Sequence, residues 1–486
     1  MRGSDQACST PPRLESRAQG SASVAESPRA TPVTVRSRNR RPLRSVPAGR
    51  GEGPLDQSPE SASTAVDDAI AGGSRLFALR GCQYFLFFVA SLAVARALGP
   101  ELRAQYALSF AVSGGVWTLI HLSLDGAALR ILGRREASLV DVSRVLSAAL
   151  LVLGTLGLGL TVAFGTLWRE PLLAGASLTA IVLAGLMVPV SLAQQLTSGL
   201  LARVGALRAY GWASAVCAAL VLAFDLILIA TSSLTPASAI GAVVLGGLIL
   251  DVALLVALGR HVGGVGLLPG GRRRVAITMV RAGAVLHPAA IAVFLTRRVD
   301  LFLVSLLASD EEVGQYSVAA TLAEIMLLAA WTLSHAAAKT QTDAEPTVAA
   351  HYTAEFLRRS WILVAAGAAL LAAVAYPAIV GLYGTEWTGS VLPFVILCFG
   401  TIAFALEQPA RVLLQRLASP SILILPAGIG ALVNVALNVA LIPLLGITGA
   451  ALASLIAYWL YALLILRRFA HETGLRMRSL FLRSGG

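Results

Sequence analysis

Two arginines and an aspartate lie close together inside one strongly apolar segment of the chain. They form the run Thr296-Arg297-Arg298-Val299-Asp300, near the middle of a stretch that is long enough to cross a membrane. On a helix, Arg297 and Asp300 are three residues apart and can pair on one face, whereas Arg298 points about 100° away from Arg297. Because guanidinium groups bind phosphate oxygens in a bidentate manner, these arginines suit a phosphate or diphosphate. The alternative is a structural Arg–Asp pair that ties helices together.

A carboxylate lies midway along the next apolar segment, where a charge at the bilayer centre costs about 2.5–3.5 kcal/mol. This residue is Glu324, and Trp331 and His335 follow it at i+7 and i+11, on the same face of a helix. The pattern predicts either a cavity wall that carries an ionisable carboxylate or a carboxylate that is paired with Arg297 or Arg298.

Three further charged residues lie within apolar segments of the N-terminal half. Arg80 lies about a turn and a half inside the first segment. It either binds a lipid headgroup or extends its long side chain to the membrane edge. Asp225 and Asp251 lie within two later segments. Each aspartate either couples protons or cations to transport or has a packing role with satisfied hydrogen bonds.

The composition places these residues in a membrane protein. Of 486 residues, 56% are hydrophobic and only 13% are charged, whereas soluble domains have about 25% charged residues. Twelve apolar segments recur, and each has the roughly 20 residues needed to cross a hydrocarbon core of about 30 Å. They are 75–97, 104–122, 143–167, 172–200, 208–231, 238–259, 282–308, 313–337, 357–382, 390–412, 421–443 and 447–467.

Basic residues concentrate in alternate loops between these segments, and they account for the net charge of +12. If the N-terminus is cytoplasmic, the even-numbered loops and the C-terminal tail hold most of the arginines. The odd-numbered loops hold few basic residues, namely Arg96, Arg103 and Arg169. They also hold several acidic residues, namely Asp310, Glu311, Glu312 and Glu386. This asymmetry follows the positive-inside rule. It predicts a bacterial inner-membrane (plasma-membrane) protein with both termini in the cytoplasm, and it explains the positive charge without nucleic acid.

The chain divides into five regions on composition and apolar periodicity. Residues 1–65 are rich in Ser, Pro and Arg and predict a disordered, basic cytoplasmic tail. A six-helix bundle is expected over 75–259, a cytoplasmic linker loop over 260–280 and a second six-helix bundle over 281–468. Residues 469–486 form a second basic cytoplasmic tail.

A short internal repeat relates the two bundles. Residues 98–106 and 308–316, offset by 210, match at several positions, including Gln105-Tyr106 and Gln315-Tyr316. Each copy forms the outer turn between the first and second helices of its bundle. An offset of six helices gives both halves the same orientation, as in transporters whose halves are related by an axis along the membrane normal. The predicted fold is therefore all-α and polytopic, with two pseudo-symmetric bundles around a central cavity.

Motifs for covalent chemistry are missing from the sequence. It contains no P-loop and no HExxH or GxSxG motif, and the predicted outer loops are all short. The four cysteines lack the spacing of a metal site. We therefore expect no catalytic residues, no metal and no cofactor.

Several stretches together resemble bacterial polysaccharide-export flippases, in order and at the spacing of that family. The family belongs to the multidrug, oligosaccharidyl-lipid and polysaccharide exporter superfamily. One departure is that Ala104-Gln105 replaces the usual glycine-containing pair before Tyr106. The similar stretches are 95–101 with 105–108, then Arg297 to Asp300 with 313–320, then Tyr383-Gly384, Trp387, Asn434, Asn438 and 441–453.

The resemblance implies a function as well as a fold. Members move an undecaprenyl-diphosphate-linked oligosaccharide from the inner to the outer leaflet by alternating access, for surface polysaccharides such as exopolysaccharide or O-antigen. The diphosphate would meet Arg297 and Arg298. Expected partners are the lipid-linked glycan, membrane lipids, and the polysaccharide polymerase and other export components.

Two alternatives stay open. One is a drug/cation antiporter of the same superfamily, coupled through Glu324, Asp225 or Asp251. The other, from a different class, is a membrane glycosyltransferase or polysaccharide ligase.

Overall fold

The computed structural model describes residues 59–204, 206–417 and 420–481, with the side chains of 59–80, 207–209, 325, 327–340, 342–343 and 420 left aside. Most of the predicted N-terminal tail, 1–65, lies outside the described residues. Within the described part every regular element is a helix. The elements are α1 (Pro59–Ile120), α2 (Leu124–Gly133), α3 (Leu139–Leu167), α4 (Arg169–Leu173), α5 (Leu178–Arg203), α6 (Leu207–Ala230), α7 (Pro236–Leu267), α8 (Arg273–Leu307), α9 (Asp310–Asp343), α10 (Pro346–Ala373), α11 (Ala375–Tyr383), η1 (Thr385–Ser390), α12 (Val391–Leu417), η2 (Pro420–Leu423), α13 (Ile424–Thr473) and η3 (Met477–Leu480).

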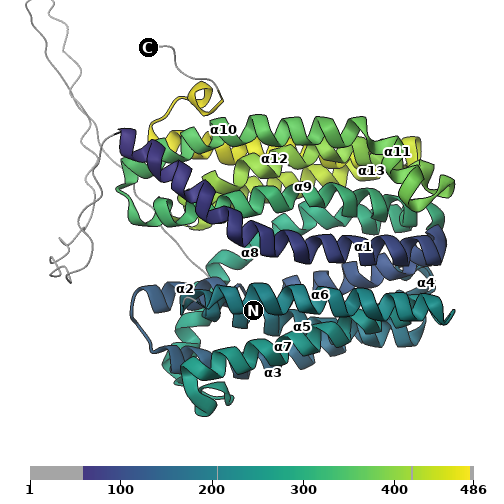
Figure 1. Ribbon diagram of the computed structural model, residues 1–486, viewed down its shortest axis with the longest axis horizontal. Coiled ribbons are helices and arrows are strands. Elements are labelled where there is room, and N and C mark those ends of the chain that lie inside the picture. Colours follow the sequence, from purple (N-terminus) through teal and green to yellow (C-terminus); the bar gives the residue numbers. More distant parts are fainter. Residues whose placement is uncertain (1–58, 205, 418–419, 482–486) are drawn as a thin grey trace, which may run out of the picture. The chain divides into compact units, whose positions relative to one another are not determined.

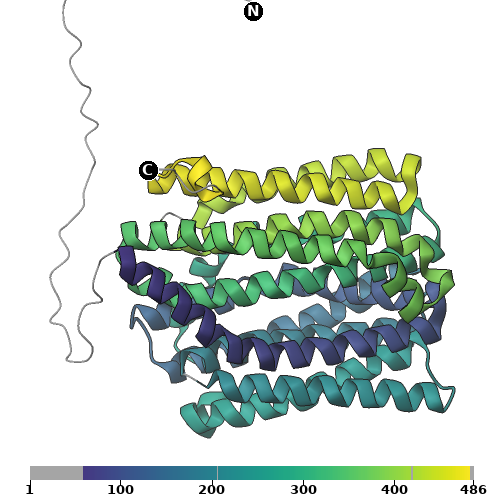
Figure 2. The same ribbon diagram turned by 45° about the horizontal axis from the view of Figure 1, so that its top comes forward.

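Within the described residues, three helices are broken at a glycine. The break at Gly263 lies close to the end of α7, whereas α1 and α13 are long on both sides of their breaks and each forms two passes. Gly99 in α1 has φ 74° and ψ 172°, and Gly446 in α13 has φ 56° and ψ −141°. Only glycine adopts such angles readily, and Pro100 suits the first turn of the helix that follows. Figure 2 shows the two arms of α13, in yellow, running side by side. With α3, α5 to α10 and α12, the two pairs of arms give the twelve passes predicted from the sequence.

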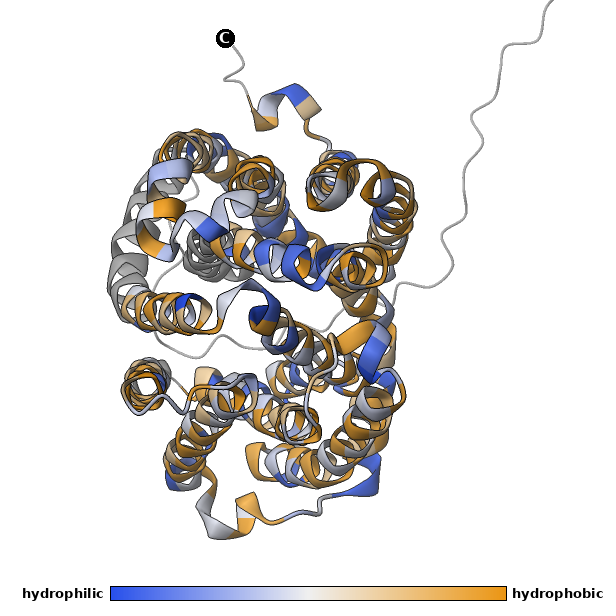
Figure 3. Cartoon of the chain, turned by 90° about the vertical axis from the view of Figure 1, so that its right-hand side faces the viewer, coloured by the Kyte–Doolittle hydropathy of each residue, from blue (hydrophilic) through white to orange (hydrophobic). Residues whose placement is uncertain are grey.

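The helices are long and apolar enough for a multi-pass membrane protein. In the described part, eight helices meet both requirements, and the broken α1 and α13 are among them. Seen along the helices in Figure 3, hydrophobic residues predominate on their surfaces. α8 and α9 are outside that group of eight, but they have 35 and 34 residues and run alongside the other helices in Figure 1. These two helices carry Arg297, Arg298, Asp300 and Glu324.

Serine residues define where several helices begin. The Ser138 hydroxyl accepts a hydrogen bond from the backbone N–H of Asp141 at 3.1 Å, and Ser177 accepts one from Ala180 at 3.2 Å. Each bond satisfies a backbone donor that has no partner inside its helix. The loops before α3 and α5 therefore end at fixed residues, which sets the depth of the side chains that follow.

The described structure has two main hydrophobic cores, and the larger one spans both predicted bundles, since it also includes Leu108, Ile181 and Val244 of the first bundle. One contains residues of α2, α3, α5, α6 and α7, and the larger one is centred on α9, α10, α12 and α13. α8 contributes to both, since Met279 packs in the first core and Leu301 and Val304 pack in the second. Pro288 lies between these contacts. The predicted linker loop over 260–280 is mostly helical, because α7 continues to Leu267 and α8 already begins at Arg273.

The repeated turns occupy equivalent places in the two bundles. Gln105 donates from Nε2 to the carbonyl oxygen of Ala174 at 3.0 Å, and Gln315 donates from Nε2 to that of Glu386 at 3.1 Å. Each acceptor lies in the turn between the third and fourth passes of its bundle. Two side chains offset by 210 residues thus anchor corresponding loops, which supports the pseudo-symmetry predicted from the repeat.

Candidate functional site

A cavity of about 1040 Å³ lies between the bundles. It extends from the middle of α8 to the end of the molecule where α2 lies, here called the α2 end (Figure 1). The opposite end, which carries α4 and α11, is called the α4 end. The walls come from α1, the turn before α2, α2, α8, α12, η2 and α13. The lining includes Trp117, His121, Asp125, Arg130, Arg134, Phe294, Arg297, Arg298, Arg411, Arg416 and Tyr461.

Arg297 and Arg298, at the inner end of this cavity, both contact the carboxylate of Glu324, which lies behind the lining residues. The Nη2 atom of Arg297 lies 3.0 Å from Oε1 of Glu324, and Nη2 of Arg298 lies 2.9 Å from Oε2. Although successive helical residues diverge by about 100°, the long arginine side chains converge on this one acceptor. The sequence leaves two interpretations of Glu324 open, a cavity wall with an ionisable carboxylate or a pair with an arginine. The structure shows the paired arrangement, with both Arg297 and Arg298 as partners.

The cluster of Arg297, Arg298 and Glu324 carries one excess positive charge and remains open to a ligand. The two arginine side chains are each 35% exposed and the glutamate is 30% exposed. Each guanidinium has five N–H donors, and the contact with Glu324 involves one nitrogen of each. The Arg297 guanidinium also lies 5.6 Å from the centre of the Phe404 ring, which fixes its position. The remaining donors can bind an anion such as a phosphate.

Asp300 belongs to a different network from the one predicted. It does not pair with Arg297 in the described structure. Its carboxylate accepts hydrogen bonds from the Tyr316 hydroxyl at 2.6 Å and the Ser454 hydroxyl at 2.9 Å, and the residue is only 3% exposed. Three residues along a helix place Asp300 about 60° around α8 from Arg297. Asp300 contacts Tyr316 of α9 and Ser454 of α13 and does not line the cavity. Its position indicates a structural role that joins three helices.

Four more arginines line the cavity, nearer its α2 end. Arg130 lies in α2 and Arg134 directly follows it, and Arg411 and Arg416 lie in α12. Among the lining residues Asp125 is the only acid, and it accepts a hydrogen bond from Gln195 at 2.7 Å.

The two arginines of α12 are held in place by different partners. Arg411 pairs with Glu407, one helical turn before it in α12, at 3.1 Å. Arg416 donates to the carbonyl oxygens of Gln341 and Ala344. The apolar pattern places these arginines, with Arg130 and Arg134, in loops and at helix ends, and their convergence depends on packing. Their repeated occurrence in the predicted cytoplasmic loops was the available signal.

Asp225 and Asp251, two further predicted site residues, do not line the cavity. Asp225 and Asp251 lie in α6 and α7 at 1% and 7% exposure, and each has one carboxylate oxygen without a hydrogen-bond partner in the described structure. The side chains of Arg80 and His335 lie outside the described residues. Arg103, expected in an outward loop, is instead 3% exposed and donates to the Ser91 hydroxyl at 3.0 Å.

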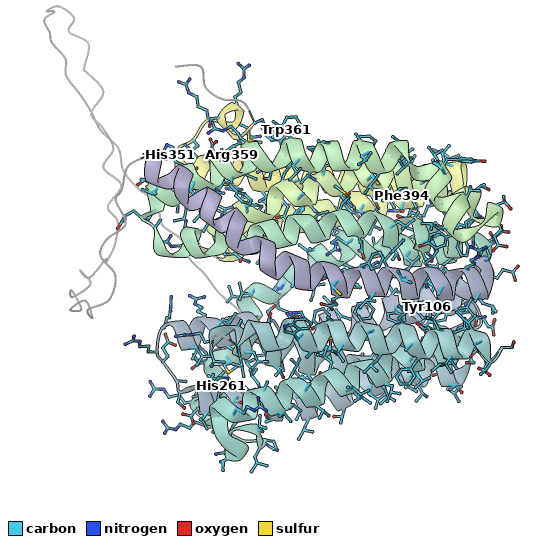
Figure 4. The ribbon with its side chains drawn as sticks, viewed as in Figure 1. Tyr106, His261, His351, Arg359, Trp361 and Phe394 are labelled. Carbon is cyan, nitrogen blue, oxygen red and sulfur yellow. The ribbon has the colours of Figure 1, made fainter. Side chains whose placement is uncertain are left out.

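Contacts between the bundles close the α4 end. Arg96 of α1 donates to the carbonyl oxygen of Leu382 in α11 at 3.1 Å, and Ser305 of α8 donates to that of Pro171 in α4 at 3.4 Å. Gly314 packs so closely against Pro100 that a Cβ at 314 would overlap the Pro100 carbonyl. Tyr106 and Phe394, labelled in Figure 4, lie toward this end, whereas His261, His351 and Arg359 lie toward the α2 end. The cavity is therefore open toward one end of the molecule and closed toward the other.

Neither a protein-family model nor a curated protein sequence matches the chain. Solved structures match its fold closely. The lipid II flippase MurJ in an inward closed conformation has a TM-score of 0.65 at 12% identity, covering 83% of this chain and 88% of MurJ. The chain has the fold of the MOP superfamily. An inward-facing MATE family multidrug resistance transporter of this superfamily gives a TM-score of 0.60 at 14% identity, covering 83% and 96% of the two chains.

A third structure extends the comparison. A MOP superfamily transporter from Pyrococcus furiosus, for which the reverse polarity of the binding pocket suggests a different function, has a TM-score of 0.61 at 15% identity, covering 87% of this chain and 96% of that one. The MOP fold confirms the all-α architecture of twelve helices in two lobes that the sequence and the family resemblance predicted.

Proposed function

We propose that this protein is a flippase that carries a diphosphate-linked lipid oligosaccharide across the bacterial inner membrane, without covalent chemistry. The observation that carries the proposal is the cavity between the bundles, whose lining residues include six arginines and one aspartate. Glu324 and Glu407 pair with three of these arginines, so positive charge remains in excess. Such a surface attracts an anionic headgroup, and a cavity shielded from bulk water strengthens that attraction. A diphosphate also matches the fork geometry of guanidinium groups.

The geometry suggests how the lipid is handled. The diphosphate enters from the α2 end, where Arg130, Arg134 and Arg416 raise the local anion concentration. The diphosphate then replaces part of the contact that Glu324 makes with Arg297 and Arg298. Rocking of the two bundles next breaks the contacts at the α4 end and exposes the headgroup there. Glu324 keeps the arginines positioned when the cavity is empty and competes with the ligand for them, which favours release.

The basic loops give this cycle a direction. Under the positive-inside rule the α2 end faces the cytoplasm, so the cavity is open to the inner leaflet. Both termini are then cytoplasmic, with bundles over about 75–259 and 281–468. We expect the exported glycan to pass to a polymerase or other export components at the outer face.

A drug/cation antiporter fits the cavity less well. A cationic substrate would meet arginines. Of the three candidate coupling carboxylates, Asp225 and Asp251 do not line the cavity, and Glu324 is paired with Arg297 and Arg298. Pocket polarity is also the feature used to distinguish the function of the P. furiosus relative. Polarity therefore favours an anionic substrate for this chain.

The experiment is a flipping assay with purified protein in proteoliposomes that contain undecaprenyl-diphosphate-linked oligosaccharide. A membrane-impermeant glycosidase measures how much glycan reaches the far leaflet. We expect transfer with the native protein and none with the Arg297→Met/Arg298→Met variant. In the parent bacterium, deletion should trap lipid-linked glycan in the inner leaflet, and normal surface polysaccharide in a deletion strain would refute the proposal.

The same preparations test the two alternatives. Proton-dependent dye efflux that is lost in Glu324→Gln would favour the antiporter. Formation of a new glycan product from the lipid-linked donor would favour the glycosyltransferase or ligase.

A further inference from the structure

A second, smaller pocket of about 290 Å³ lies inside the N-terminal bundle, beside the arginine-lined cavity. Its walls come from α1, α5 and α6, and Trp117 lines both spaces. The flippase proposal makes no use of this pocket. Its lining residues are Gly114, Trp117, Ser191, Gln194, Gln195, Ser198 and Tyr210.

The polar wall of the pocket is a stripe along one face of α5. Ser191, Gln194, Gln195 and Ser198 occupy positions i, i+3, i+4 and i+7, which fall on a single helical face. Four neutral hydrogen-bonding side chains in a row are expensive inside a membrane unless they meet partners or line a polar space. The stripe therefore needs an explanation beyond helix packing.

Helix packing satisfies only part of this stripe. Gln195 donates to Asp125, and Ser198 donates to a carbonyl of its own helix at 3.1 Å. The Gln194 amide forms no hydrogen bond to any residue that the structure describes. The indole N–H of Trp117 is likewise buried without a partner in the described structure. The Gln194 amide thus keeps hydrogen-bonding capacity at the wall of the pocket, whereas the indole N–H of Trp117 is buried away from it.

The lining chemistry suits a sugar ring rather than an ion. No charged side chain is among the lining residues, so the pocket offers little to a diphosphate or a cation. Amide and hydroxyl groups can both donate to and accept from sugar hydroxyls, and aromatic rings such as Trp117 and Tyr210 provide a broad apolar face. A volume near the lower end for ligand pockets, about 300 Å³, suits one or two sugar units.

The pocket is also placed to receive a sugar attached to the diphosphate. Trp117 is the wall common to both spaces, and His121 stacks on its ring at 4.8 Å and so fixes its orientation. Phe294 packs against Gly115, where an added Cβ would lie 3.4 Å from its ring. Phe294 is one turn of α8 before Arg297 and Arg298. The arginine pair and the neutral pocket therefore lie on either side of this α1–α8 contact.

We infer that this pocket is a sugar-binding subsite that recognises the first units of the glycan, with Gln194 and Trp117 as its hydrogen-bonding and stacking residues. The inference rests on the proposed function, because the sugar reaches the pocket as part of a diphosphate-linked lipid. It divides recognition between two surfaces: the arginines bind the diphosphate, and the face of α5 selects the glycan.

The test compares two probes on purified protein in detergent. One is undecaprenyl diphosphate alone, and the other is a panel of the same lipid carrying one or two hexose or N-acetylhexosamine units. We expect at least one sugar-bearing probe to bind the native protein more tightly than the bare lipid. Gln194→Leu should weaken that binding about tenfold, the effect of losing roughly 1.4 kcal/mol of hydrogen bonding, and leave the bare lipid unaffected.

A matched control is Gln408→Leu, which makes the same change in the spanning helix α12 at a residue that lines neither cavity. It should leave both affinities unchanged. Unchanged binding of the bare lipid to Gln194→Leu shows that this variant is folded, and Ser191→Ala provides a milder second variant.

The outcomes separate the two proposals. Equal affinity of the native protein for the bare lipid and for every sugar-bearing probe overturns the sugar subsite but leaves the flippase intact. Equal loss for both probes in Gln194→Leu also overturns it. Absence of binding by any diphosphate lipid overturns the proposed function itself.

Discussion

Replacement of Glu324 by glutamine tests whether the cluster of Arg297, Arg298 and Glu324 binds an anion or only ties helices together. Glutamine keeps the shape of the side chain and one acceptor oxygen. It presents an NH₂ group to the second guanidinium, so one of the two contacts, at 3.0 and 2.9 Å, is lost. The change also gives the cavity a further unit of positive charge.

The structure sets the size of both effects. Two unit charges about 4 Å apart attract by about 4 kcal/mol at an effective dielectric constant near 20. Because the three side chains are about one-third exposed, screening and desolvation reduce the expected loss of stability to about 1–3 kcal/mol. Loss of the Glu324 charge leaves one arginine charge uncompensated. At about 6 Å from the diphosphate and a dielectric constant near 40, this charge strengthens binding by about 1.4 kcal/mol for each negative charge of the ligand, which is at least about tenfold in affinity.

We therefore expect Glu324→Gln to melt at a lower temperature than the native protein and yet bind undecaprenyl diphosphate more tightly at low salt. The assays are thermal unfolding in detergent and a direct titration with the lipid. The gain in affinity should shrink as salt is raised, because exposed charges are screened.

A matched control exists elsewhere in the chain. Glu355 in α10 also pairs with two arginines, Arg358 and Arg359, but it lies outside the cavity. Glu355→Gln should lower stability without changing lipid affinity. If Glu324→Gln behaves like Glu355→Gln, the cluster is structural and the reasoning that places the diphosphate there is wrong.

Three further predictions follow from other contacts. Gly314→Val should abolish flipping, because its side chain would collide with the Pro100 carbonyl and prevent the α4 end from closing. A cysteine introduced at the α4 end should then be labelled faster by a water-soluble reagent, and unchanged labelling would contradict the proposed closure. Tyr316→Phe should cost about 1–3 kcal/mol of stability, since it removes the 2.6 Å hydrogen bond to the buried Asp300 carboxylate, whereas a loss of lipid binding at unchanged stability would place Asp300 in the binding site. Asp225→Asn and Asp251→Asn should leave flipping in proteoliposomes unchanged, because neither aspartate lines the cavity; loss of transport in either variant would support ion coupling.

Much of the architecture was predictable because it depends on local chemistry. Apolar stretches of about 20 residues define membrane helices wherever they occur. The repeated turns around Gln105 and Gln315 were visible as a sequence match, and they form equivalent hydrogen bonds. The count of twelve helices is confirmed, and one boundary differs. Arg103 falls in the predicted loop between segments 75–97 and 104–122, whereas the second arm of α1 restarts directly after Gly99 and includes Arg103.

The sequence by itself determined the twelve passes, the two like halves and the presence of two arginines and a carboxylate at membrane depth, since these follow from hydropathy and spacing along the chain. Only the tertiary structure decided which of these groups meet. Glu324 contacts both arginines, Asp300 turns to Tyr316 and Ser454, and α2 and α12 add four more arginines to the cavity. The polar stripe of α5 lines a pocket only because it packs beside Trp117 of α1. Such contacts join residues distant in sequence, and they depend on how helix faces pack, which no local pattern specifies.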